Sequence, residues 1–415
     1  MEIGKYSFGT GDRFAQQGEA QLKALTKASA VLGVEIVPVW NKSNREHTFI
    51  GTTPAHTRNA ADAAVKALGY GNQYFVDADH INATNVEKFI DASDFFTLDV
   101  ADYIGKKAQQ ADIDKFVDSN MKYVGKLQIP GISEPFDVND EQLKTIACKF
   151  LYAIQEAGRI YRKIENAKGK DNFVAEVSMD EVNDAQSPVE MFFILSAISS
   201  ENIPAQTIAP KFSGRFNKGV DYVGDINMFA KEFEDDLLVI DFAVREFNLP
   251  ENLKLSVHSG SDKFSIYPAI GKLIKKYDKG IHVKTAGTTW LEEITGLSMS
   301  NDVDSINLVK AIYTSALSRI DEVCAPYATV IDISTERLPK SAEVALWSGE
   351  KLANTLRHIP DQPDYNPDFR QLMHVSFKIA AEYGNVFTEA LEKHKKIVEQ
   401  QVIENIYDRH LRRLF

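Results

Sequence analysis

The sequence is poor in cysteine, and this scarcity excludes two kinds of site. Cys148 and Cys324 are the only cysteines among 415 residues, and neither stands in a Cys-x-x-Cys pair. A disulfide framework or a cysteine-based zinc site is therefore not expected, and a reducing compartment fits this composition.

Long apolar runs are also lacking. No stretch approaches the roughly 18 consecutive apolar residues of a membrane span. The N-terminal segment MEIGKYSFGTGDRF has no basic region followed by an apolar run, as a secretory leader would. We therefore expect a soluble, cytoplasmic protein without a membrane partner.

Positive charge is in deficit. Asp and Glu number 59 against 47 Lys and Arg, which gives a net charge of −12. Nucleic acid is not the expected partner, because binding to a phosphate backbone requires a basic face. An anionic small molecule remains compatible, since a few lysines or arginines can reverse the sign of charge inside one pocket.

The chain does contain a regular alternation of short β-prone runs with long amphipathic segments. Segments 19–33 and 57–69 carry apolar residues at three- and four-residue spacing and end at glycine, which predicts helices. Strands are predicted at 5–11, 34–40, 73–79, 172–178, 205–212, 253–260, 280–287 and 370–377.

This alternation predicts parallel strands joined by helical crossovers. Eight such units indicate an α/β fold, a closed (β/α)8 TIM-type barrel, and no GxGxxG motif follows a strand to favour a dinucleotide-binding sheet. We expect a single barrel domain over residues 1–415, with helical insertions at about 91–140 and 290–369 that could serve as lids.

Polar residues recur at the ends of the predicted strands, where barrel enzymes place their chemistry. Imidazoles and carboxylates from separate strands, with open positions for substrate oxygens, are typical of a catalytic site for a divalent cation. Zn, Mn, Ni, Co and Fe are all compatible. The residues in question are Asp79, His80, Glu176, His258, His282 and His374.

Each of these residues also has a purely structural interpretation. Asp79 or Asn82 could cap a helix that begins after the strand, and His258 and His282 could be hydrogen-bonded core histidines. Glu176 lies inside the apolar run FVAEVSM, where an unpaired carboxylate is costly to bury. It therefore requires a cation or a functional pocket beside it.

Strand geometry raises a difficulty at the motif DADH. Alternation puts Asp77 and Asp79 on one side of the strand and His80 on the other. His80 joins the same site only if the strand has ended by then. Otherwise Asp77 or Asp79 becomes the metal ligand.

Two lysines indicate a rival chemistry. Lys211 and Lys284 lie in predicted strands, and a strand lysine forms a Schiff base with a carbonyl substrate when its pKa is lowered. Alternatively, Lys211 and Arg215 would hold a substrate carboxylate through fixed positive charge.

Seven motifs together resemble the tagaturonate/fructuronate epimerase family, over almost the whole chain. They are YSFGTGDRF (6–14), YFVDADHI (74–81), FVAEVS (173–178), IAPKFSGRFNKGVDYVGD (208–225), LSVHSGSDKFSIYP (255–268), HVKTAGTTWLE (282–292) and LMHVSF (372–377). The resemblance implies a metal-dependent epimerase that interconverts D-tagaturonate and D-fructuronate, with the ketohexoses fructose and tagatose as further substrates.

The resemblance also implies roles for single residues. His80, His258 and His282 would bind the metal, and Asp79 and Glu176 would form an acid/base pair with one carboxylate on each face of the reacting centre. Lys211, Arg215 and His374 would bind the substrate. The competing interpretations are a barrel aldolase or aldose–ketose isomerase acting on a sugar acid, and a sugar-acid binding protein without turnover.

Overall fold

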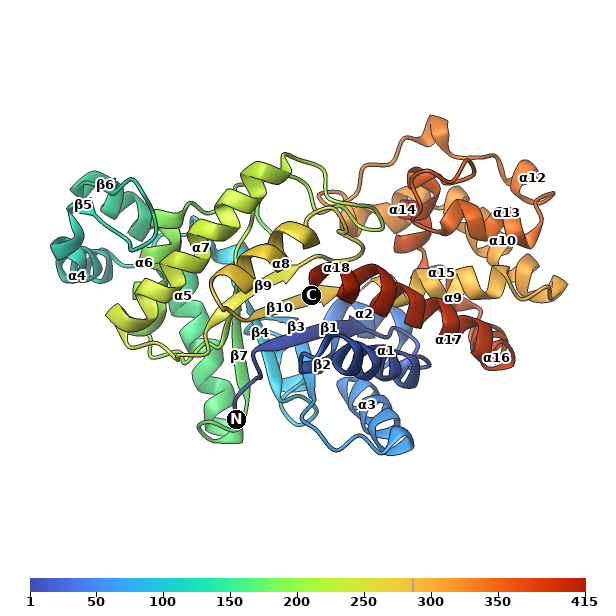
Figure 1. The fold of residues 1–415 in the computed structure, drawn as a ribbon, viewed down its shortest axis with the longest axis horizontal. Coiled ribbons are helices and arrows are strands. Elements are labelled where there is room, and N and C mark those ends of the chain that lie inside the picture. Colours follow the sequence, from blue (N-terminus) through green and yellow to red (C-terminus); the bar gives the residue numbers. More distant parts are fainter. Residues whose placement is uncertain (286) are drawn as a thin grey trace.

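The computed structural model describes residues 1–285 and 287–415, and within them eight parallel strands close into a barrel (Figure 1). Their order around the barrel is β1-β10-β9-β8-β7-β4-β3-β2. This arrangement confirms the expected (β/α)8 TIM-type barrel with helical insertions. The strands are β1 (Tyr6–Gly11), β2 (Ile36–Ser43), β3 (Phe75–Ile81), β4 (Phe95–Asp99), β7 (Val174–Ser178), β8 (Thr207–Ala209), β9 (Lys254–His258) and β10 (Ile281–Thr285). Ala286, which the predicted strand 280–287 includes, lies outside the described residues.

Helices surround the barrel and join most consecutive strands. They are α1 (Gly18–Leu32), α2 (Asn44–Ile50), α3 (Pro54–Leu68), α5 (Asp140–Lys168), α6 (Pro188–Ser200), α7 (Ile226–Phe247) and α8 (Tyr267–Lys276). The predicted helices at 19–33 and 57–69 correspond to α1 and α3, which end at Gly33 and Gly69 in the left-handed conformation. The connection from β3 to β4 differs, because it contains only the 3₁₀-helix η1 (Val86–Lys88).

Two strand assignments from the sequence were wrong. The predicted strand 370–377 is largely helical, since α14 spans Pro367–Val375. Asn366 caps this helix by accepting a hydrogen bond from the Phe369 N–H, and Pro367 occupies the first turn, a helix start that outweighs the β-prone composition. The missing barrel strand is instead β4, within the segment expected as an insertion.

The extra elements lie at the two ends of the molecule's long axis (Figure 1). At one end, between β4 and α5, are η2 (Ala101–Tyr103), α4 (Gln110–Asn120), η3 (Met121–Tyr123) and the hairpin of β5 (Gly125–Leu127) and β6 (Phe136–Val138). The elements that follow β10 are α9 (Thr288–Ser298), α10 (Val303–Ser318), α11 (Ile320–Cys324), η4 (Ala325–Tyr327), η5 (Thr335–Arg337), α12 (Ser341–Val344), α13 (Gly349–Leu356), α14, α15 (Phe377–Glu382), α16 (Asn385–Lys393), α17 (Lys395–Ile403), the π-helix η6 (Glu404–Leu411) and α18 (Arg412–Leu414). Most of them lie at the other end, whereas α18 returns to the middle of the molecule beside α8 (Figure 1).

The barrel interior changes from apolar to charged along its axis. An apolar cluster fills it near the N-terminal ends of the strands, formed by Ile3, Val37, Val39, Phe75, Phe95 and Val174. Two residues further along, the inward-facing positions of three strands are Asp77, Thr97 and Glu176. The polar side chains of the barrel interior that could take part in a reaction therefore lie toward the C-terminal ends of the strands, as in other barrels of this kind.

No helix in residues 1–285 or 287–415 is both long and apolar enough to cross a membrane.

Candidate active site

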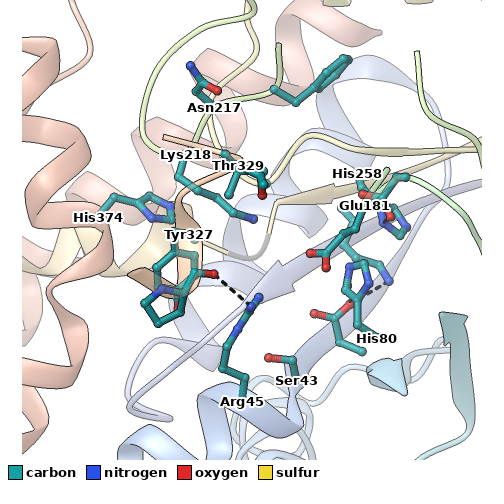
Figure 2. A pocket seen from close by; sticks show the side chains of 18 of the residues that line it. Ser43, Arg45, His80, Glu181, Asn217, Lys218, His258, Tyr327, Thr329 and His374 are labelled. Atoms are coloured by element: carbon teal, nitrogen blue, oxygen red, sulfur yellow. Dashed lines mark hydrogen bonds and ion pairs between the residues drawn. The ribbon is translucent and has the colours of Figure 1, made fainter. Parts of the chain in front are cut away.

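A cavity of about 280 Å³ opens at the C-terminal end of the barrel (Figure 2). Most of the expected site residues line it, namely Asp79, His80, Lys211, Arg215, His258 and His374. Glu176 and His282 are fully buried beneath it. Among the lining residues that the sequence analysis did not single out are Asp180, Glu181 and Lys218. The strand-end rule would have found Asp180, because it lies two residues after β7.

A bulge in β3 resolves the difficulty at the DADH motif. The register between β3 and β4 shifts between Ala78 and Ile81, and His80 adopts a positive φ of 48°. This conformation is unusual for a residue with a side chain and interrupts the regular alternation. As a result, Asp79 and His80 both line the cavity although they are consecutive.

His80, Asp180 and His258 form a group that could hold a metal ion. One potential ligand atom from each lies within 4.8 Å of the others. His258 Nδ1 is 3.2 Å from Asp180 Oδ1 but makes no hydrogen bond of good geometry within the described part of the chain, as expected of two ligand atoms directed at one ion. Two imidazoles and one carboxylate suit Zn, Mn, Ni, Co or Fe.

A second group shares His80 and includes Asp99 and Glu181. His80 Nδ1 lies 3.1 Å from Asp99 Oδ2, which ties the imidazole to the end of β4. A carboxylate on the other ring nitrogen is a common way to orient a metal-binding histidine. We therefore regard Asp99 as the residue that orients His80 and the group with His258 as the candidate metal site.

His282 lies apart from both groups. It is fully buried in β10, its Nδ1 is 2.9 Å from Ser7 Oγ, and its ring packs against Phe95 with centroids 5.3 Å apart. Burial lowers its pKa to about 3, so the imidazole is neutral. The structure therefore does not bring the three expected histidine ligands together.

Lys284 is the centre of the charged layer below the cavity. Its amino group lies 2.8 Å from Asp77 Oδ2, 3.0 Å from Asp79 Oδ1 and 3.1 Å from Glu176 Oε1. Burial alone would lower its pKa, but the three carboxylates outweigh burial and hold the pKa well above its usual value. A Schiff base requires the neutral amine, so this environment argues against Lys284 as a nucleophile.

The two expected acid/base carboxylates lie on the same side of the barrel and share Lys284. Burial raises the pKa of Asp79, but the charges of Lys284 and of the neighbouring imidazoles outweigh it and lower the pKa below its usual value. The same balance holds the pKa of Glu176 well below its usual value. Both carboxylates are therefore ionised, and the positive charge beside them is what permits their burial.

Glu176 also positions His258. Its Oε1 accepts a hydrogen bond from His258 Nε2 at 2.7 Å, which leaves Nδ1 directed at Asp180. This carboxylate fixes the tautomer and the orientation of the imidazole in the metal group. Glu176 thus contacts the candidate metal ligand His258 and also Lys284, and Lys284 in turn contacts Asp79.

The expected substrate-binding residues have different surroundings. Lys211 is partly buried, which lowers its pKa, and its amino group lies 5.8 Å from the centre of the Phe216 ring. Arg215 is exposed and forms an ion pair with Asp332 at 3.0 Å. His374 comes from α14, and its buried ring nitrogens have no hydrogen-bond partner in the described part of the chain.

Comparisons with known proteins identify the family of the chain. The family model described as UxaE, tagaturonate epimerase, matches residues 1–414. The tagaturonate/fructuronate epimerase of Thermotoga maritima is 29% identical over 408 residues, which cover 95% of this chain and 76% of that protein. The native crystal structure of fructuronate-tagaturonate epimerase UxaE from Cohnella laeviribosi superimposes with a TM-score of 0.82 at 25% identity, covering 100% of this chain and 82% of that one. A complex of that enzyme with one glycerol gives a TM-score of 0.81 at the same identity and coverage.

These matches confirm the resemblance found in the motifs and the expectation of a sugar epimerase. The chain belongs to the tagaturonate epimerase family.

Proposed function

We propose that the protein interconverts D-tagaturonate and D-fructuronate by inverting C4, with the ketone counted as C2. Family membership supports this reaction, as do the activities for which the relatives from Thermotoga maritima and Cohnella laeviribosi are named. The observation that carries the proposal is the candidate metal group, His80, Asp180 and His258, directly beside the carboxylate of Asp79 at the cavity floor.

The position of the inverted carbon restricts the chemistry. C4 is β to the ketone, so its C–H bond is not acidified by the carbonyl group. A retro-aldol route avoids this problem. A base takes the proton of the C4 hydroxyl, and the C3–C4 bond breaks to give an enediolate and an aldehyde. The aldehyde then rotates to present its opposite face to the enediolate, and the C3–C4 bond re-forms with C4 inverted. Atoms and charge balance without any oxidant or reductant.

The donor set suits a divalent cation. We assign Asp180 as the third ligand beside His80 and His258, in place of His282, because Asp180 lies with them and His282 is held by Ser7 below. A bound divalent cation supplies Lewis-acid polarisation of the ketone and stabilises negative charge on the enediolate oxygens.

Asp79 is the proposed base. Its carboxylate is ionised, lines the cavity and lies 3.8 Å from His80 Nε2, beside the metal group. Glu176 is the proposed second member of the acid/base pair and acts from beneath the cavity. Lys284 donates to both carboxylates and so holds their charges fixed while a proton arrives and leaves.

Substrate binding is assigned to the rim of the cavity. Lys211 supplies positive charge there, and His374 offers sugar hydroxyls two ring nitrogens that have no hydrogen-bond partner among the described residues. Arg215 lines the same cavity and would have to leave Asp332 to reach a substrate carboxylate.

The test is turnover of D-fructuronate by protein stripped with a chelator, before and after addition of Mn, Ni, Co or Zn, with products identified by NMR. Formation of D-tagaturonate only after metal addition is the expected result. Turnover that ignores the chelator would contradict the metal site. A product with its carbonyl at C1 would instead indicate an aldose–ketose isomerase, and no turnover with any metal would overturn the proposed function.

A further inference from the structure

The positive charges around the cavity are not equivalent. Within the described part of the chain, six lysine and arginine side chains line it: Arg13, Arg45, Lys211, Arg215, Lys218 and Lys284. Three of these already pair with carboxylates. Arg13 lies 2.9 Å from Glu46, Arg215 lies 3.0 Å from Asp332, and Lys284 bonds to the carboxylates below the cavity. Arg45, Lys211 and Lys218 remain as candidates for an incoming anion.

Two of these three have other partners. The Arg45 guanidinium lies 5.0 Å from the centre of the Tyr327 ring, and its Nη1 is 3.5 Å from the Pro326 carbonyl (Figure 2). Lys211 lies in the field of Asp180 and Glu181, whose negative charges oppose the effect of burial on its pKa. Its amino group also lies 5.8 Å from the centre of the Phe216 ring, so Lys211 has a ring contact as well as acidic neighbours.

Lys218 has no such compensation. Within residues 1–285 and 287–415 it forms no ion pair and no side-chain hydrogen bond. Figure 2 shows its side chain extending into the cavity that His374 and Glu181 also line. Burial is the main cause of the lowered pKa of His374 and of Lys263, and the charge of Lys218 acts in the same direction on both.

The loop that carries Lys218 is held firmly. The Lys218 N–H donates to the Val330 carbonyl at 2.7 Å. The buried amino group of Lys263 donates to the carbonyls of Asn217 and Val220, at 2.9 and 2.8 Å, on either side of Lys218. This bracing orients Lys218 before any ligand arrives, which reduces the entropy lost on binding.

A glycine makes room for the amino group. A Cβ placed at Gly260 would lie 3.2 Å from Lys218 Nζ and 3.5 Å from its Cδ. The side chain of Lys218 thus extends over the bare backbone that follows β9. The amino group stays open on its other side toward the cavity.

We propose that Lys218 binds the carboxylate of the sugar acid and that this contact makes the site prefer ketouronates to neutral ketohexoses. This inference rests on the proposed function. The ketone at C2 would lie at the metal group, and the carboxylate at C6 is at the far end of the carbon chain. A cation whose charge is not already balanced by Asp180 and Glu181 is therefore the suitable partner for it.

The discriminating variant is Lys218→Met, which removes the charge and keeps the length of the side chain. The measurements are kcat/KM for D-fructuronate and the inhibition constant of D-fructose against that reaction, since fructose has an alcohol at C6. Loss of a charged hydrogen bond should lower kcat/KM for D-fructuronate about 10- to 100-fold, mainly through KM, and leave the fructose inhibition constant within about 2-fold. Lys218→Arg keeps the charge and should retain most of the activity.

Lys144→Met on the exposed surface of α5 is the matched control and should behave as the parent protein. An unchanged KM for D-fructuronate in Lys218→Met would overturn the inference. So would an equal loss of affinity for fructuronate and fructose, because a merely structural role moves both. Failure of the parent protein to turn over D-fructuronate would instead overturn the proposed function, so the two failures are distinguishable.

Discussion

His80 and His258 come from opposite sides of the barrel, yet their imidazole rings meet edge to face with centroids 5.2 Å apart. Strands β3 and β9 are separated by four positions in either direction around the eight-stranded barrel. Closure of the sheet into a barrel is what brings side chains from such strands together at its C-terminal end. The bulge at His80 completes the approach by turning its ring into the cavity.

The first prediction separates the two buried histidines by metal content. His258→Ala should lose the bound metal and turnover together, because it removes a donor from the candidate site. His282→Ala should retain metal, since His282 lies below the site and bonds to Ser7. Metal analysis of the purified variants by mass spectrometry decides between them. Metal lost equally in both variants would restore His282 as a ligand and contradict the assignment of Asp180.

The second prediction concerns the base. Asp79→Asn should lower kcat by about 10²- to 10⁴-fold, the usual contribution of general acid–base catalysis, while the protein keeps its metal. Glu176→Gln should also abolish turnover, and it should weaken metal binding because Glu176 orients His258. Asp102→Asn changes an exposed carboxylate in η2 and serves as the control. Near-normal kcat in Asp79→Asn would remove Asp79 from the mechanism.

The third prediction concerns Lys284. Lys284→Met leaves Asp77, Asp79 and Glu176 buried without their cation, which should destabilise the protein by about 3 kcal/mol or more. Denaturant unfolding measures this loss.

A second experiment tests the protonation of Lys284. In the parent protein, treatment with borohydride and D-fructuronate should leave no covalent adduct, because the lysine is protonated. A substrate adduct found on Lys284 by peptide mass spectrometry would reverse this conclusion.

The fourth prediction concerns pH and a carboxyl group outside the site. Burial raises the pKa of Glu292 to about 7, despite the opposing charges of Arg409 and Arg370. Between the ordinary pKa of a glutamate and about 7, the Glu292 carboxyl is therefore protonated in the folded protein and ionised in the unfolded chain. The contribution of Glu292 to stability is complete below that ordinary value and is lost as pH rises through about 7.

Glu292→Gln cannot ionise and removes this dependence. The variant should gain stability relative to the parent protein between pH 4 and pH 8, by about 3 kcal/mol for a shift of this size. Urea unfolding at both pH values, on parent and variant, measures the difference. A gap between the two proteins that does not change with pH would show that Glu292 ionises normally in the folded state.

Sequence patterns predicted seven of the eight barrel strands, because each has a β-prone apolar run bounded by turns or helices. The strand β4 was missed for a physical reason. Thr97 and Asp99 point into the charged end of the barrel, so the segment FFTLD lacks the continuous apolar character of a buried strand. The segment around His374 failed in the opposite way, since its apolar residues belong to the helix α14, in which every residue from Asp368 to Val375 is buried.

The residue types of the site were visible in the sequence, since a carboxylate inside an apolar strand and histidines at strand ends are costly unless they have partners. Which of them meet was decided by the tertiary structure alone. Closure of the barrel brought His80 to His258 and enclosed Lys284 among three carboxylates. His282 lies two residues before Lys284 along β10, deeper in the barrel, and is therefore outside the metal group. Sequence records which side chains need a partner, but contacts between strands far apart in the chain depend on how the barrel closes, on register and on the bulge at His80.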